Sequence, residues 1–300
     1  MVLRTAGWSA AAALLVLAVG FVPSGDSGSG RSVTSSSARG AAPGSPGVQT
    51  AAANTPMLPL FARTTDGHLR AYEPKGTGGL ESAVDLGTGY SAATALVRIP
   101  ISGSGGAQDL YIRMNNALYY TAERGTETKL LGTGWDTYNL LMTPGDLGGT
   151  TQPDLLGRDT TGALWLYQSK ADGTFAPRVR AGSGGWNGMD ALAGYGDYTG
   201  DGKADLLART PTGTLYIYPG TGSTAADASL GTRITVGTGW NAYKSLVSTG
   251  DNSGDGKADL IATDAAGALW LFKGTGSTSA PFAARVQIGT SGWAGFNALF

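Results

Sequence analysis

This sequence of 300 residues has no cysteine and a single histidine, His68. The missing cysteines exclude disulfide bonds, thiolate metal sites and a Cys–His nucleophile. One histidine excludes histidine-based zinc sites and leaves room for at most one Ser–His–Asp arrangement. His68 directly follows Asp66 and Gly67, a typical hairpin turn, so we interpret it as a turn residue.

Charge is also scarce. The chain has 21 Lys and Arg against 22 Asp and Glu, a net charge of −1, and it shows no basic cluster. This balance argues against nucleic acid and anionic membrane surfaces as partners. Glycine is abundant by contrast: its 49 residues are more than twice the usual share of about 7%. Low charge, many aromatic residues and frequent glycine are typical of a turn-rich all-β protein.

A single apolar run stands near the N-terminus, from Ala10 to Val22. It is too short to span a bilayer comfortably and has the length of a signal-peptide core, with Arg4 before it. We predict that residues 1–22 are a signal peptide and that the protein is secreted to the extracellular space; an uncleaved membrane anchor is the alternative. Residues 23–56 are mostly Ser, Gly, Ala and Pro, which predicts a disordered linker, so folding begins at residue 57.

Internal repetition predicts the architecture of residues 57–300. A Gly-Thr-Gly-Trp motif and its variants recur about every fifty residues, ending at Tyr90, Trp135, Trp186, Trp240 and Trp293. Each unit contains four short apolar segments separated by glycine turns, a pattern that indicates four strands. Five such units predict an all-β fold, a β-propeller of five four-stranded blades.

The two ends of the repeat region complement each other. Residues 58–69 align with residues 204–215, so the first unit lacks its first strand. Residues 293–300 align with residues 240–247 and supply one spare first strand. We therefore expect the N- and C-terminal strands to pair and to close the ring without an open edge.

Two near-identical acidic loops, residues 196–206 and 250–260, carry the strongest chemical signal. Oxygen-bearing side chains stand at loop positions one, three, five and nine, and the position-seven backbone carbonyls could add one ligand each. Calcium takes about six to eight oxygen ligands in a flexible geometry, so both loops predict Ca²⁺ sites. The predicted ligands are Asp197, Thr199, Asp201, Lys203 and Asp205 in one loop, and Asp251, Ser253, Asp255, Lys257 and Asp259 in the other.

The EF-hand is excluded as an explanation because it needs a Glu at position twelve and flanking helices. Ala208 and Ala262 occupy that position here, and the residues around them are strand-like. An acidic hairpin turn that binds no ion remains the alternative. The loop at 146–154 keeps the first and last acids, and the loop at 101–109 keeps the last one. We expect weak or no calcium binding at the former and none at the latter, with the last Asp capping a turn.

These loops and the sequence pattern around them resemble the FG-GAP/VCBS repeat family, the calcium-binding propeller repeats of integrin α-subunits. The Asp-Leu-Leu-Ala-Arg segment at 205–209 and the Gly-x-Leu-Trp-Leu-Tyr segment at 162–167 resemble those of secreted VCBS-type proteins of actinobacteria. The resemblance implies an adhesion or binding platform, sometimes attached to a secreted hydrolase. Thr199 and Ser253 replace the family's usual Asp, and five units replace the seven of integrins, so no blade-specific ligand site carries over.

The sequence thus predicts a non-catalytic, monomeric binding or adhesion module for an extracellular glycan or cell-surface protein, without membrane insertion after signal cleavage. Aromatic faces stack on sugar rings, which makes the repeated tryptophans candidate ligand-binding residues; wedges in blade packing are the alternative interpretation. These residues are Trp135, Trp186, Trp240 and Trp293. A polysaccharide-active hydrolase, or an accessory domain of one, is the alternative function. It would need two carboxylates that no motif selects.

Overall fold

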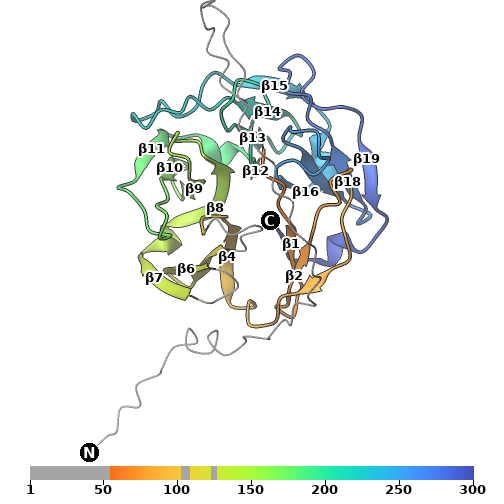
Figure 1. Cartoon of the computed structure of the whole chain (residues 1–300). Helices are drawn as coiled ribbons and strands as arrows, with labels where there is room; N and C mark the ends of the chain where they lie inside the picture. The colour runs from red at the N-terminus through yellow and green to blue at the C-terminus, as the bar shows by residue number, and fades with distance from the viewer. Residues whose placement is uncertain (1–54, 103–108, 123–126) are drawn as a thin grey trace, which may run out of the picture.

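The computed structural model describes residues 55–102, 109–122 and 127–300. The predicted signal peptide and nearly all of the predicted linker lie outside this range. Five four-stranded antiparallel sheets surround a central axis, as Figure 1 shows, which confirms the predicted five-bladed propeller. Within the described residues, no helix has the length and apolar character needed to cross a membrane.

In blades 2 to 5 the chain runs from the innermost strand outward, whereas the innermost strand of blade 1 is the last strand of the chain. Blade 1 contains β20 (Ala298–Leu299), β1 (Leu60–Arg63), β2 (Leu69–Tyr72) and β3 (Val84–Asp85). Blade 2 contains β4 (Ala93–Arg98), β5 (Leu110–Met114), β6 (Ala117–Ala122) and β7 (Glu127–Thr133). Blade 3 contains β8 (Tyr138–Gly145), β9 (Asp154–Asp159), β10 (Leu164–Tyr167) and β11 (Val179–Gly182). Blade 4 contains β12 (Ala191–Ala193), β13 (Leu206–Arg209), β14 (Leu215–Tyr218) and β15 (Ile234–Gly237). Blade 5 contains β16 (Tyr243–Val247), β17 (Leu260–Asp264), β18 (Leu269–Phe272) and β19 (Val286–Gly289).

The last strand closes the ring as predicted. In the pairing of β20 with β1, Ala62 lies opposite Leu299 and Arg63 lies opposite Ala298. The Phe61 N–H donates to the Phe300 carbonyl at 2.8 Å, and the Phe300 N–H donates back at 3.0 Å. The two phenyl rings meet edge to face at 5.6 Å between centroids. Blade 1 is therefore built from both ends of the repeat region.

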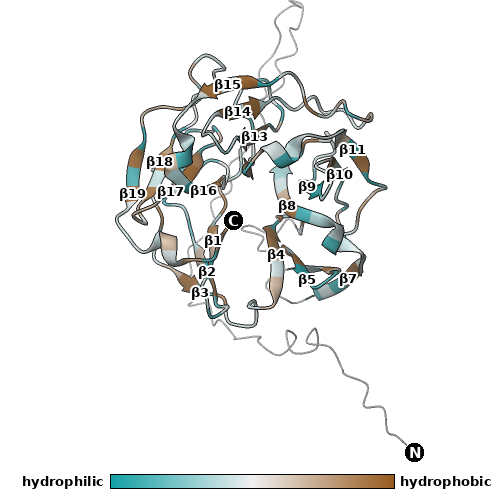
Figure 2. Ribbon diagram, turned by 180° about the vertical axis from the view of Figure 1, so that it is seen from behind, coloured by the Kyte–Doolittle hydropathy of each residue, from teal (hydrophilic) through white to brown (hydrophobic). Residues whose placement is uncertain are grey.

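Aromatic wedges fill the space between blades. Short 3₁₀ turns begin at the repeated tryptophans and precede the innermost strands; they span Trp135–Thr137, Trp186–Gly188, Trp240–Ala242 and Trp293–Gly295. Each indole stacks on an aromatic ring at the end of a third strand: Trp186 lies 4.6 Å from Tyr218, and Trp240 lies 4.6 Å from Phe272. Figure 2 shows hydrophobic segments in strands such as β14 and β15 that contribute to this core.

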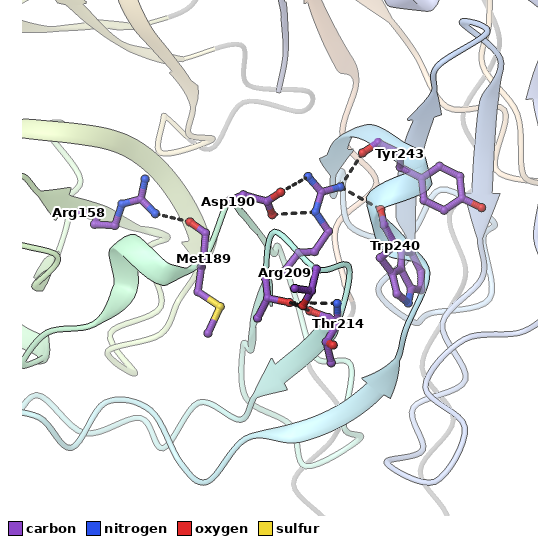
Figure 3. Close-up of polar contacts among 9 residues, drawn as sticks. Arg158, Met189, Asp190, Arg209, Thr214, Trp240 and Tyr243 are labelled. Atoms are coloured by element: carbon purple, nitrogen blue, oxygen red, sulfur yellow. Dashed lines mark hydrogen bonds and ion pairs between the residues drawn. The ribbon is translucent and has the colours of Figure 1, made fainter.

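A repeated arginine at the end of a second strand clamps each of blades 1 to 4 to the next blade. Arg209 is buried, and its Nη1 donates to the carbonyls of Trp240 at 3.0 Å and Tyr243 at 2.6 Å, while Asp190 accepts from its Nε at 2.8 Å (Figure 3). Arg158 makes the equivalent bond to the Met189 carbonyl at 2.7 Å, also drawn in Figure 3. Arg63 and Arg113 repeat the pattern in blades 1 and 2.

Blade 5 lacks this clamp. Thr263 occupies the arginine position in β17, and its buried hydroxyl has no hydrogen-bond partner among the described residues. Lys244 occupies the position of the acceptor Asp190, so both halves of the pair differ together. The interface between blade 5 and blade 1 therefore relies on other contacts, including Trp293 stacked 4.7 Å from Tyr72.

Candidate functional site

Both complete acidic loops connect an innermost strand to the second strand, from β12 to β13 in blade 4 and from β16 to β17 in blade 5. Each loop turns tightly because glycines lie between its acidic residues. Gly200 and Gly202 adopt φ values of +83° and +84°, which side chains with a Cβ rarely tolerate. The blade geometry then presents each loop at the same end of the ring.

In the blade 4 loop, one carboxylate oxygen from each of Asp197, Asp201 and Asp205 lies within 4.8 Å of the others. The loop backbone holds the first acid from both sides: Asp197 Oδ1 accepts from the Gly200 N–H at 2.6 Å, and Oδ2 accepts from the Gly202 N–H at 2.7 Å. Three convergent carboxylates form an all-oxygen donor set that suits a hard cation. These residues can hold a metal ion.

The last acid of each loop is buried and hydrogen bonded. Asp205 Oδ2 accepts from the Tyr198 N–H at 2.8 Å, and Oδ1 accepts from the Gly220 N–H at 2.9 Å, which ties the loop to the segment after β14. In blade 5, Asp259 Oδ2 accepts from the Ser253 N–H at 2.7 Å, and Oδ1 accepts from the Gly274 N–H at 2.8 Å. Burial raises the pKa of each of these carboxyl groups to about 6. Asp205 Oδ2 also accepts from the Thr199 N–H at 3.0 Å, and these bonds match the turn-capping role expected for this position.

The blade 5 loop has the same internal hydrogen bonds but different surroundings. Asp251 Oδ1 accepts from the Gly254 N–H at 2.6 Å, and Oδ2 accepts from the Gly256 N–H at 2.7 Å. The chain entering the propeller crosses this loop: the Asp251 N–H donates to the Pro56 carbonyl at 2.9 Å, and Asp251 is 4% exposed. Among the described residues, the blade 4 acids form a convergent group and the blade 5 acids do not.

The fourth position of each loop touches the next blade. A Cβ on Gly200 would lie 2.3 Å from the Gly276 carbonyl oxygen, and a Cβ on Gly254 would lie 2.3 Å from that of Gly76. Both distances are far below van der Waals contact, so any side chain there would push adjacent blades apart. The loops therefore belong to the interfaces between blades, which the sequence pattern did not reveal.

The incomplete loops fold without a full ligand set. In blade 3, Asp146 accepts from the Thr150 and Thr151 N–H groups at 2.7 Å each, so its carboxylate shapes the turn. Asp154 lies fully buried, and burial raises the pKa of its carboxyl group to about 7. In blade 2, Asp109 accepts from the Ser102 N–H at 2.7 Å, while residues 103–108 lie outside the described range.

A groove of about 650 Å³ runs between the loops of blades 3, 4 and 5. Two acids, Asp146 and Asp197, and two lysines, Lys203 and Lys257, are among the residues that line it. Both lysines are exposed. The blade 4 loop, which carries the three convergent acids, thus borders the groove. This end of the ring is therefore a candidate binding surface.

The structure places the other candidate residues as follows. Trp135, Trp186 and Trp240 are 7–8% exposed, Trp293 is half-buried, and all four stack on core aromatics. This placement accounts for a wedge role; their role in ligand binding stays a prediction.

His68 lies on a hairpin of blade 1 with its Nδ1 3.1 Å from Asp85 Oδ2. Sequence reasoning missed the arginine clamps, although the Ala-Arg-Thr segments at 62–64 and 208–210 carry their signal.

Comparison with known proteins supports part of the predicted relationship. Residues 146–208 and 197–262 match the FG-GAP-like repeat family. No curated protein matches the chain in sequence. The solved structures similar to this chain include a Bacteroides caccae protein of unknown function, at 9% identity over 78% of this chain and 73% of that chain, with a TM-score of 0.38.

Two further solved structures show comparable similarity. A chain of the nidogen/laminin complex is 12% identical over 81% of this chain and 95% of that chain, with a TM-score of 0.41. The Dos1 propeller is 13% identical over 78% and 56%, with a TM-score of 0.34. The family match covers both the blade 3 and blade 4 loops and reaches the blade 5 loop. Residues 146–262 of this five-bladed propeller are therefore similar to FG-GAP-like repeats.

Proposed function

We propose that this protein is a secreted, non-catalytic calcium-binding propeller that acts as a binding or adhesion module for an extracellular glycan or protein. The observation that carries the proposal is the convergent group of Asp197, Asp201 and Asp205 inside an FG-GAP-like repeat. Its position at the edge of the groove between blades 3, 4 and 5 links the ion to a surface that a partner can reach.

Calcium would bind to the three carboxylates, with the Thr199 hydroxyl and the Lys203 carbonyl completing the set. The ion would offset the mutual repulsion of the acids and hold Gly200 against the neighbouring blade at Gly276. Asp251, Ser253, Asp255, Lys257 and Asp259 are the equivalent set in blade 5. Extracellular calcium at millimolar levels would saturate even sites with dissociation constants of about 10⁻⁴ M, so the ion acts as a structural component.

The groove suits a partner with both apolar faces and polar groups. Most of its exposed lining is apolar, and carboxylates and two exposed lysines lie within it, a composition compatible with sugar rings and their hydroxyl groups. A ring with several similar units also presents repeated weak sites whose binding adds through avidity.

The test combines metal and ligand binding on the purified chain. Calorimetric titration with CaCl₂ should show binding, and EDTA should lower the melting temperature by several degrees, because ligand binding stabilises the folded state by mass action. Retention on a panel of glycan and cell-wall polymers should occur in calcium and decrease in EDTA. Glu81→Gln, an exposed acid of blade 1 outside the loops, is the matched control and should behave like the wild type.

Identical melting curves in calcium and EDTA would contradict the metal assignment. Release of soluble sugars from the polymers would contradict the non-catalytic assignment and favour a hydrolase. Retention that persists unchanged in EDTA would separate ligand binding from the acidic loops.

A further inference from the structure

The central cavity is lined by a buried arginine to which the described residues offer no hydrogen bond. The innermost strands of all five blades surround a cavity of about 320 Å³. Arg98, the last residue of β4 in blade 2, lines it and is 3% exposed. Among the described residues, neither Nε nor Nη1 of Arg98 has a hydrogen-bond partner, and no carboxylate lies within ion-pair distance.

The side chain reaches across the ring. The Arg98 guanidinium carbon lies 5.6 Å from the ring centroid of Tyr195, which follows β12 in blade 4. Blade 3 separates these two blades, so Arg98 extends over the axis instead of along a blade interface. At the equivalent position, the innermost strands of blades 3, 4 and 5 carry Thr143, Gly194 and Ser248, which also line the cavity. These small residues leave room around the guanidinium.

The charge persists in this setting. Burial lowers the pKa of Arg98 to about 10, while Tyr195 and the more distant carboxylate of Glu73 act in the opposite direction, so the group is cationic at neutral pH. A buried charge is costly unless a counter-charge and hydrogen bonds compensate it. The clamp arginines show the usual solution in this protein, since each donates to two backbone carbonyls. Arg98 makes no such bonds within the described residues.

We propose that the central cavity is a binding site for a small organic carboxylate, held by Arg98. The planar guanidinium fork pairs with a carboxylate through two parallel hydrogen bonds. Thr143 can add a third donor, because its Oγ1 accepts from the Gly145 N–H at 3.2 Å and its own proton has no acceptor among the described residues. Leu96, Leu141 and Leu246 line the remaining wall and suit a carbon body more than a strongly hydrated inorganic dianion.

The experiment uses sodium glucuronate as the probe, with glucose as the neutral analogue and chloride and sulfate at matched ionic strength, all at constant calcium. Calorimetry on the purified chain should show one glucuronate bound per chain and no glucose. Arg98→Met should weaken glucuronate binding by about tenfold or more, because it removes the charged fork. Arg180→Met removes an exposed charge on β11 and should leave the affinity unchanged.

A second variant protects the test against misfolding. Arg98→Lys keeps the charge but loses the fork, so it should fold and should bind glucuronate more weakly than the wild type. Absence of glucuronate binding by the wild type would overturn the proposal. Unchanged affinity in a folded Arg98→Met or Arg98→Lys chain would also overturn it, as would equal binding of chloride and sulfate.

Discussion

Blades 4 and 5 carry acidic loops that differ at only two of eleven positions, yet the two loops lie in different surroundings. In blade 4 the three acids converge within 4.8 Å, and Asp197 stays partly exposed beside the groove. In blade 5 the chain at Pro56 covers Asp251. At the second loop position, Tyr198 reaches the next blade through its hydroxyl, whereas the buried amide of Asn252 has no partner among the described residues.

The same two blades differ at their outer interface. Blade 4 holds blade 5 through Arg209, while blade 5 presents Thr263 to blade 1. The comparison shows that the local sequence specifies how the first acid of each loop is held, because Asp197 and Asp251 accept the same backbone hydrogen bonds. The surrounding chain determines how exposed the loop is and how firmly its blade is held.

The largest effect should come from removing the strand that completes blade 1, the neighbour of the unclamped blade 5. Deletion of residues 294–300 removes β20 and exposes the edge of β1. We expect loss of the cooperative melting transition or aggregation, measured by circular dichroism and light scattering. A soluble truncated chain with an unchanged melting temperature would contradict the closure.

The arginine clamp is the next largest difference between the blades. Arg209→Ala leaves Asp190 and two buried carbonyls without their partner, and should lower the free energy of unfolding by about 3 kcal/mol. The reciprocal change, Thr263→Arg with Lys244→Asp, should install a clamp in blade 5 and raise that free energy by about 1 kcal/mol. Urea denaturation measures both, and equal stability of Arg209→Ala and the wild type would exclude an energetic role for the clamp.

The two loops should also differ in their response to calcium. Asp201→Ala disrupts the convergent group of blade 4 and should remove most of the calcium-dependent stabilisation, which is about 2.7 kcal/mol at a hundredfold excess over the dissociation constant. Asp255→Ala should remove less. Melting temperatures with and without EDTA give the comparison, and a larger loss from Asp255→Ala would reverse the assignment of the stronger site.

A pH-dependent contrast concerns Asp154, the equivalent of Asp205 and Asp259 in the incomplete blade 3 loop. Its carboxyl pKa is raised by burial to about 7, whereas the unfolded chain has a value of about 3.9. The folded state therefore favours the protonated form, so this group costs stability progressively as pH rises from about 4 to 7. Asp154→Asn should flatten that part of the profile of unfolding free energy against pH. An unchanged profile would assign the pH dependence to other groups.

Much of the fold was predictable because its signals are periodic. Repeated Gly-Trp motifs and alternating short apolar segments predicted the blades, and the alignment of residues 293–300 with 240–247 predicted the closing strand. The acidic group of blade 4 was predictable from ligand spacing alone. The cover over Asp251 was not, because it depends on where a non-repetitive segment passes. Arg98 also escaped prediction, since one arginine in a β-strand carries no sign of which residues face it across a ring.

The arginine clamps have a consequence for how such a ring changes over generations. Each guanidinium donates to backbone carbonyls, at residues as different as Trp186, Met189, Trp240 and Tyr243. Since every residue offers a carbonyl, the accepting unit can exchange its side chains without losing the bond, and selection acts on the donating unit alone. The clamp therefore depends on the identity of one residue, the arginine of the donating blade. A single substitution of that arginine abolishes the clamp. Blade 5 shows this state: Thr263 replaces the arginine, and its hydroxyl has no partner among the described residues.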